Sequence, residues 1–215
     1  MKKIAIIGAG GFGREVKNLI EQINKHIEEY IIIGFFDDNI DKYAQISGLP
    51  VLGKISEINN INTETYLVFG IGDPKFKQKI FKTIKNKNII FPTLIHPSVI
   101  KNNNNIKIGD GSIICAGTIL TCDIVIGNFV LLNLCCTVGH DAIIKNFSSF
   151  MPSVNISGEV IIEDCVYVGT GATIINKIKI GENSIIGAGA LVSKKIPSNC
   201  TAVGIPAKPI KFHNN

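Results

Sequence analysis

Residues 137–141 read TVGHD and place a histidine and an aspartate inside a long run of isoleucines and valines. Histidine removes and returns protons near neutral pH, so His140 is a candidate general base. Neighbours on an extended strand point to opposite faces, so Asp141 can orient the imidazole only if both residues lie in a turn. Gly139 favours such a turn. In an extended chain, Asp141 would be only a solvated acid.

A second candidate site is the glycine loop GAGGFG, residues 8–13, which follows an aliphatic run and opens a helical pattern. Three of its glycines match G-x-G-x-x-G, a pattern whose backbone approaches a pyrophosphate at a helix N-terminus. An acid at the end of the second strand, Asp37 or Asp38, could accept a hydrogen bond from a ribose hydroxyl. The alternative is that Gly13 and Asp38 serve only helix packing and a turn.

Taken alone, the glycine loop predicts a dinucleotide cofactor such as NAD. The α/β pattern spans fewer than 100 residues, which is too short for a full dinucleotide fold, and the rest of the chain contains no recognisable dehydrogenase motif. Half of such a fold can hold one nucleotide diphosphate. We therefore expect a nucleotide-bearing ligand at this loop.

The composition favours small anionic ligands over nucleic acid, because the net charge of +5 comes from scattered lysines with few aromatic residues. No metal site is expected, since the six cysteines form no CxxC pair and the four histidines are far apart in the sequence. No apolar run approaches the roughly 20 residues of a membrane helix, and IAII near the N-terminus is too short for a signal peptide. We expect a cytoplasmic protein that binds neither nucleic acid nor membrane.

The first part of the chain alternates aliphatic runs with helical patterns. Buried strands are predicted at 3–8, 31–36 and 65–72, and helices at 11–25 and 74–87. This alternation predicts a small Rossmann-like parallel α/β domain over residues 1–98.

From Ile106 onward the sequence divides into fifteen consecutive hexads without an insertion. The third residue of every hexad is aliphatic or aromatic, the first is mostly small or β-branched, and the fourth is often glycine. We attribute these glycines to the unusual dihedrals of a sharp corner. The pattern predicts a parallel β-helix of about five coils over residues 99–200, with a C-terminal tail at 201–215. His140 holds the fifth place of its hexad, so we expect it to face outward.

The hexads, closed by AVGIPAKPIK at 202–211, resemble the hexapeptide-repeat acyltransferases, which are left-handed parallel β-helix trimers. With IIGAGGFGREV, FFDDN, GIGD and LIHPSVI added, the whole chain resembles the sugar acetyltransferases that act on nucleotide-linked amino sugars or sialic acid. The resemblance implies a homotrimer that uses acetyl-CoA as co-substrate and a nucleotide-sugar as acceptor.

The resemblance also implies roles for particular residues. His140 would be the general base and Asp141 would raise its basicity. The sugar nucleotide would contact Gly10, Gly11, Phe12, Asp37, Asp38 and Gly72. Coenzyme A would contact Ser149, Gly158 and Thr170, in a groove between neighbouring subunits.

The function predicted from these features is direct N-acetylation of a nucleotide-linked 4-amino-4,6-dideoxyhexose destined for surface glycans. Cys135 and Cys136 are near enough in sequence to be tested as nucleophiles. One alternative is O-acetylation of sialic acid by the same residues. Another is a nucleotide-binding trimer without catalytic activity.

Overall fold

A computed structural model describes residues 1–41, 43–102 and 105–213 and divides the chain into two compact units. The N-terminal unit contains Met1–Gly72 and Phe76–Pro97, and the C-terminal unit contains Asp73–Lys75 and Ser98–Asn215. No helix in the described parts of the chain combines the length and the apolar character needed to cross a bilayer.

The N-terminal unit is an α/β structure around a six-stranded sheet of order β3-β4-β2-β1-β5-β6. Its strands pair in parallel, apart from the antiparallel pair of β3 and β4. The elements are β1 (Lys2–Ile7), α1 (Gly11–His26), β2 (Tyr30–Phe36), β3 (Gln45–Ile46), β4 (Leu49–Gly53), a 3₁₀ helix (Ile55–Asn60), β5 (Thr65–Phe69), α2 (Pro74–Thr83), β6 (Ile89–Ile90) and β7 (Leu94–Ile95). The strands and helices predicted for this region are confirmed.

Helix α1 packs closely on the sheet because glycines stand where backbones approach each other. A Cβ atom on Gly13 would lie 2.0 Å from the carbonyl oxygen of Gly8, and one on Gly70 would lie 2.5 Å from the Cα of Gly13. Val16, Leu19 and Ile20 then continue the buried face of the helix. Gly13 thus has the packing role that was weighed against ligand binding.

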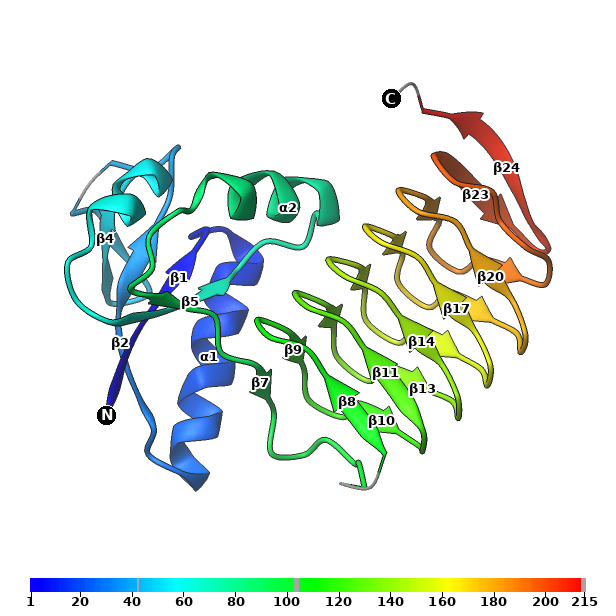
Figure 1. Ribbon diagram of the computed structural model, residues 1–215, viewed down its shortest axis with the longest axis horizontal. Helices are drawn as coiled ribbons and strands as arrows, with labels where there is room; N and C mark the ends of the chain where they lie inside the picture. The colour runs from blue at the N-terminus through cyan, green and yellow to red at the C-terminus, as the bar shows by residue number, and fades with distance from the viewer. Residues whose placement is uncertain (42, 103–104, 214–215) are drawn as a thin grey trace. The chain divides into compact units, whose positions relative to one another are not determined.

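The C-terminal unit is a parallel β-helix whose strands pair with the strand 18 residues later, as Thr137 on β13 lies opposite Asn155 on β16. Figure 1 shows the successive coils stacked side by side. The first face is β8 (Ile106–Ile108), β11 (Ile124–Ile126), β14 (Ile143–Ile144), β17 (Ile161–Ile162) and β20 (Lys179–Ile180). The second face is β9 (Ile113–Ile114), β12 (Leu131–Leu132), β15 (Ser149–Phe150), β18 (Tyr167–Val168) and β21 (Ile185–Ile186). The third face is β10 (Ile119–Leu120), β13 (Thr137–Val138), β16 (Asn155–Ile156), β19 (Thr173–Ile174) and β22 (Leu191–Val192).

The coils follow the hexads predicted from the sequence. Each strand of the three faces holds the second and third places of a hexad, and the third-place side chains from Ile114 to Val192 are at most 2% exposed. First-place side chains such as Ser112, Thr118 and Val154 are also buried, which explains their small size. The column expected to form the core therefore does so, except that Ile108 at its start is only half-buried.

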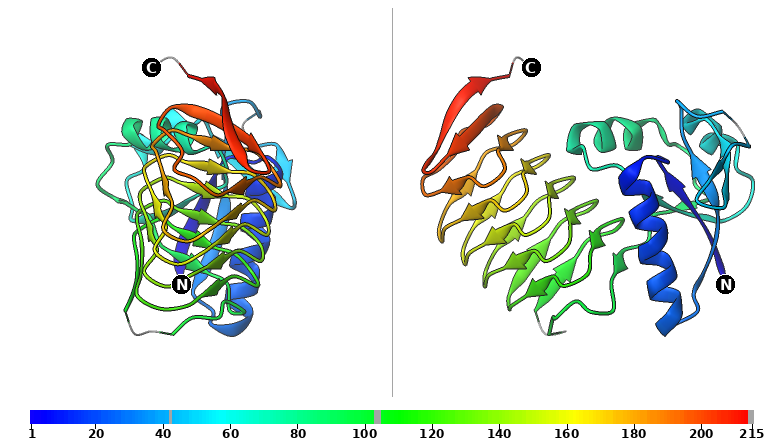
Figure 2. Two further views of the ribbon diagram at one scale, coloured as in Figure 1. Left: turned by 90° about the vertical axis from the view of Figure 1, so that its right-hand side faces the viewer. Right: turned by 180° about the vertical axis from the view of Figure 1, so that it is seen from behind.

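The stack on the second face is longer than the predicted five coils, because that count covered only the hexads. Strand β23 (Cys200–Gly204) pairs in parallel with β21, and β24 (Ala207–Phe212) returns antiparallel to β23. Figure 2, seen from behind, shows this hairpin at the end of the stack. The segment expected as a tail is thus paired up to His213, whose backbone N–H donates to the carbonyl of Asn199 at 2.7 Å.

The explanation given above for the fourth-place glycines is wrong. The left-handed conformation of each corner belongs to the sixth place, where every residue from Gly111 to Gly189 at six-residue intervals has a positive φ, most of them not glycine. Fourth-place glycines instead allow coils to stack. A Cβ on Gly139 would lie 2.5 Å from the backbone nitrogen of Gly158 in the next coil.

Candidate active site at a corner of the coil stack

His140 and Asp141 lie together on the corner that joins the third face to the first. The imidazole Nδ1 lies 2.8 Å from Asp141 Oδ2, and the two side chains are 57% and 59% exposed. Asp141 has φ 58°, so the chain turns at this residue and both side chains reach the same side. The turn required for Asp141 to orient the imidazole is therefore present. The other ring nitrogen, Nε2, has no hydrogen-bond partner among the described residues.

The coils above and below define what surrounds the imidazole. The backbone N–H of Glu159 donates to the carbonyl of His140 at 2.8 Å, and the N–H of Asp141 donates to the carbonyl of Cys122 at 3.2 Å. A Cβ on Gly158 would lie 2.4 Å from His140 Nε2, so the ring occupies the space of a side chain that the next coil lacks. Within the described residues, no acceptor takes the backbone N–H of Gly158.

The cysteine nearest to His140 in the structure is Cys122, one coil earlier on the same corner. Partial desolvation and the charges of Asp123 and Asp141 raise the pKa of its thiol, which disfavours a thiolate. Cys136 is fully buried, and burial raises its pKa to about 11. Cys135 lies on the corner between the second and third faces. The 18-residue coil period could have identified Cys122 as a neighbour of His140.

The three residues expected to contact coenzyme A are not brought together within this chain. Gly158 adjoins His140, whereas Thr170 is exposed on the corner between the second and third faces. Ser149 lies on the second face, is fully buried, and its Oγ has no hydrogen-bond partner. Of the three, Gly158 alone shares the corner of the imidazole.

The proposed nucleotide residues gather at one edge of the N-terminal sheet, where the parallel strands β1, β2 and β5 all end. Asp37 Oδ2 accepts a hydrogen bond from the backbone N–H of Ala9 at 2.9 Å, which ties the end of β2 to the glycine loop. Asp38 Oδ1 accepts from the N–H of Ile55 at 2.8 Å. Gly72 follows β5. A Cβ atom built on Gly8 would lie 2.9 Å from Cγ1 of the neighbouring Ile71, so this loop lies close to the glycine loop.

The first turn of α1 is open to an anionic group. Gly10 is the N-cap residue, no side chain caps the helix, and the first turn contains no acid. Gly10 and Gly11 are exposed and Phe12 is half-exposed. Free N–H groups and the positive end of the helix dipole favour a phosphate at such a terminus.

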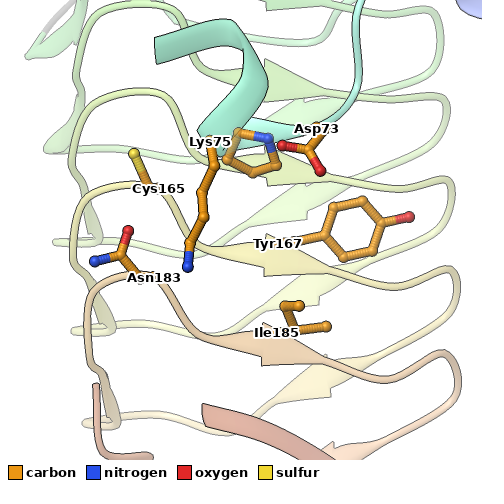
Figure 3. A pocket seen from close by; sticks show the side chains of 7 residues that line it. Asp73, Lys75, Cys165, Tyr167, Asn183 and Ile185 are labelled. Carbon is orange, nitrogen blue, oxygen red and sulfur yellow. The ribbon is translucent and has the colours of Figure 1, made fainter. Parts of the chain in front are cut away.

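The C-terminal unit also has a cavity of about 350 Å³ on its second face, remote from the corner of His140. Tyr167 and Ile185 line it from the strands, and Cys165 and Asn183 line it from the adjoining corner. Figure 3 shows the Lys75 side chain lying between Asn183 and the Tyr167 ring. No sequence motif had marked this cavity. Among the described residues, no group of three or more His, Cys, Asp or Glu side chains could hold a metal ion.

A β-helix built from hexads, in one chain with an α/β unit of the kind that binds nucleotides, is typical of a class of transferases. Comparison with known proteins identifies the family within this class. The family described as the PglD N-terminal domain matches residues 3–84, and the bacterial transferase hexapeptide (six repeats) matches residues 159–194. GDP-perosamine N-acetyltransferase of Escherichia coli O157:H7 is 30% identical over 98% of this chain and 97% of its own.

Two solved structures extend the similarity to the whole chain. A mutant of perosamine N-acetyltransferase from Caulobacter crescentus, in complex with CoA and GDP-perosamine, aligns with a TM-score of 0.86 at 25% identity, covering 98% of each chain. The acetyltransferase domain of PglB from Neisseria gonorrhoeae FA1090, in complex with acetyl coenzyme A, aligns with a TM-score of 0.86 at 29% identity, covering 97% of this chain and 99% of its own. The chain therefore belongs to the hexapeptide-repeat sugar acetyltransferases, and the resemblance stated from the sequence is confirmed.

Proposed function

We propose that this enzyme transfers the acetyl group of acetyl-CoA to the amino group of a nucleotide-linked amino sugar, with His140 as general base. The observation that carries the proposal is the contact of Nδ1 with Asp141, which leaves Nε2 facing outward over Gly158. Asp141 fixes the tautomer in which Nε2 accepts a proton. Relatives crystallised with CoA and GDP-perosamine support both substrates.

The reaction is a direct transfer in one displacement. The sugar amine loses a proton to Nε2 as its nitrogen attacks the thioester carbonyl, and the carbon–sulfur bond then breaks. The proton on Nε2 passes to the departing sulfur, so the products are the N-acetyl sugar and CoA thiol. The free N–H of Gly158 supports a role in binding coenzyme A or the oxyanion of this step. The raised pKa of Cys136 and of Cys122 disfavours a thiolate nucleophile, which supports direct attack.

The acceptor we propose is a nucleotide-linked 4-amino-4,6-dideoxyhexose of surface glycan synthesis. Its diphosphate would lie at Gly10, Gly11 and Phe12, where the α1 terminus is uncapped. Asp37, Asp38 and Gly72 would border the nucleoside at the same sheet edge. Both carboxylates already accept backbone hydrogen bonds, so a ribose hydroxyl would use their remaining lone pairs.

We also propose the left-handed winding and the homotrimer of this family. The two faces that meet at the corner of His140, the third and the first, carry exposed apolar side chains. Ile119 is 38% exposed, Val125 41% and Ile143 39%. A second copy would therefore cover the first and third faces, and the groove at His140 would lie between subunits. Ser149 and Thr170 remain proposals for contacts with coenzyme A, and for Ser149 the hydroxyl would have to become accessible.

A panel of acceptors tests the function. The protein is incubated with acetyl-CoA and either nucleotide-linked amino sugars or sialic acid, and CoA release and product mass are measured. N-acetylated nucleotide sugar is the expected product, whereas turnover of sialic acid alone would establish O-acetylation instead. Absence of all turnover would remove the mechanism and leave a nucleotide-binding trimer without catalytic activity. Full turnover by His140→Ala would remove His140 as the general base. A cytoplasmic location is part of the proposal, supported by six cysteines that are all free thiols.

A further inference from the structure

The C-terminal hairpin of β23 and β24 buries almost none of its second strand. Ala207 is the only buried residue of β24, and the five residues that follow it are exposed. Ile205 in the turn is 75% exposed, and Ile210 and Phe212 on β24 are 66% and 63% exposed. Large apolar side chains that a paired strand holds outward are typical of a contact surface.

The hairpin is a built part of the fold. Its two strands pair from Cys200 and Phe212 up to the turn, and Nε2 of His213 lies 2.8 Å from Oγ1 of Thr201 just beyond the last pair. Strand β24 is at the edge of its sheet, at the end of the coil stack in Figure 1, and β23 is its only partner strand in the described chain. The exposed side chains are therefore held in fixed places beside an open strand edge.

The charge around the hairpin is positive. After Glu182 the sequence contains four lysines and no acid. Lys208 and Lys211 lie on β24 among its apolar residues, and both are exposed and form no ion pair within the part of the chain that the structure describes. Lys194 and Lys195 belong to the last turn before the hairpin and are also exposed. The surface thus combines apolar side chains with unneutralised cations.

A bilayer that contains anionic lipid satisfies both properties. Apolar side chains enter the boundary between head groups and acyl chains, and lysines beside them meet the lipid phosphates. A second copy of the chain fits less well, because pairing two β24 edges would bring lysines of like charge together, and Pro209 has no N–H to donate. Nucleic acid would use the lysines and leave the apolar side chains in water.

We propose that the C-terminal hairpin docks this protein on an anionic phospholipid bilayer as a peripheral contact. Ile205, Ile210 and Phe212 enter the interface, and Lys208 and Lys211 bind head-group phosphates. The expectation of no membrane contact considered only spanning segments and signal peptides, and a hairpin that lies on a surface needs neither.

The proposed homotrimer would strengthen this contact. Strand β23 pairs with β21, so the hairpin continues the second face, and copies that meet at the first and third faces leave it open. Rotation about a threefold axis does not change the height of a point along that axis. The three hairpins therefore lie at one level and can meet a flat surface together, which multiplies a weak single contact.

Sedimentation with vesicles tests the docking. The full-length protein is mixed with vesicles of phosphatidylcholine alone, or of phosphatidylcholine and phosphatidylglycerol in equal parts, and the bound fraction is measured at low and high salt. Wild type is expected to bind the anionic vesicles, less at high salt, and to leave the neutral vesicles unbound. Ile210→Ser/Phe212→Ser is expected to bind about tenfold more weakly. Lys208→Gln/Lys211→Gln is expected to lose a similar factor of about tenfold and to show a flatter salt dependence.

Two matched controls lie at the opposite end of the coil stack. Ile100→Ser removes an isoleucine that is 64% exposed, and Lys107→Gln removes an exposed lysine. Both are expected to bind vesicles as the wild type does. Failure of the wild type to bind anionic vesicles, equal binding to neutral vesicles, or an equal loss in the controls would overturn the docking.

A further pair of outcomes separates this proposal from its neighbours. Weaker binding in the lysine variant with none in the apolar variant would overturn bilayer docking in favour of a general affinity for polyanions such as nucleic acid. Acetylation of soluble substrates without vesicles is expected to be unchanged in Ile210→Ser/Phe212→Ser. Absence of that acetylation in the wild type would overturn the proposed function and leave the vesicle result to decide the docking by itself.

Discussion

Two corners of the same coil stack are built differently, although their hexads have the same register. On the corner between the first and second faces, the fifth-place side chains of Asn128, Asn146 and Asp164 each accept a hydrogen bond from a backbone N–H of the preceding coil. The backbone N–H of Asp110 donates to Asn128 Oδ1 at 2.9 Å, that of Asn128 to Asn146 Oδ1 at 2.9 Å, and that of Asn146 to Asp164 Oδ1 at 2.7 Å.

The corner of His140 has no such ladder among the described residues. Its fifth places hold Cys122, His140, Gly158, Asn176 and Lys194, and the imidazole occupies the space left by the missing side chain of Gly158. The comparison indicates that the first corner holds neighbouring coils together, whereas the second gives up those bonds to leave an imidazole and a backbone N–H open to ligands.

The largest effect is expected when the missing side chain is restored. In Gly158→Ala the new Cβ would meet the imidazole at about the Nε2 position, so the ring must move. A displacement of this kind is expected to lower kcat by about 100-fold. Steady-state acetylation with a thermal melt of the same sample measures it. An unchanged kcat would show that the ring position over Gly158 is not needed.

A smaller loss of activity is expected when the ring keeps its place but loses its charged partner. Asp141→Asn retains the shape of the side chain but replaces the charged, acceptor-only carboxylate with a neutral amide that can also donate, so the tautomer is held less firmly and kcat is expected to fall about 10-fold. Asp123→Asn, one coil earlier on the same corner, is the matched control for loss of a nearby acid. Equal losses in both variants would indicate that general negative charge matters and that the specific bond does not.

On the other corner the expected effect is on stability alone. Asn146→Ala leaves the N–H of Asn128 without its acceptor, and the free energy of unfolding is expected to fall by about 1 to 2 kcal/mol. Urea unfolding measures the loss. Because Asn146 lies on a different corner from His140, kcat of the folded protein should stay within about twofold of the wild type. A large fall in kcat would remove the distinction between the two corners.

The smallest effect is expected from the ion pairs of the first face. Hydrogen bonds from Lys145 and Lys179 hold the pKa of Glu163 below its ordinary value of 4.5. Because the folded-state pKa is depressed, this contribution to stability is present above pH 4.5 and is lost as the pH falls through the folded-state value. Wild type should therefore be more stable than Glu163→Gln at pH 7, with the difference shrinking below pH 4.5. Glu64→Gln, an exposed acid elsewhere, should show no such convergence.

Much of the fold could be predicted because each hexad place meets the same surroundings in every coil. A buried third place requires an apolar residue fifteen times over, and that repetition exposes the period. The outward position of His140 followed from the same register. The role of the fourth-place glycines could not be predicted from the register, because close contact with the next coil and a left-handed backbone conformation both favour glycine.

Parts of the site could not be predicted because they depend on which coils become neighbours. The proximity of Cys122 and Gly158 to His140 follows from the 18-residue period, yet only the folded coils show the ring above Gly158. Burial of Ser149 is a property of the folded chain that its place in the strand pattern does not predict. The bond between His140 and Asp141 needed the left-handed turn at Asp141, a conformation uncommon for residues other than glycine.

The most direct test of the account is the rate of a single turnover in His140→Gln, measured beside the affinity of that variant for CoA. Glutamine can still form hydrogen bonds but cannot accept the amine proton, so the chemical step is expected to slow by about 10²- to 10⁴-fold while CoA affinity is unchanged. A single-turnover rate within about threefold of the wild type would contradict the assignment of proton transfer to this corner, whatever the substrate.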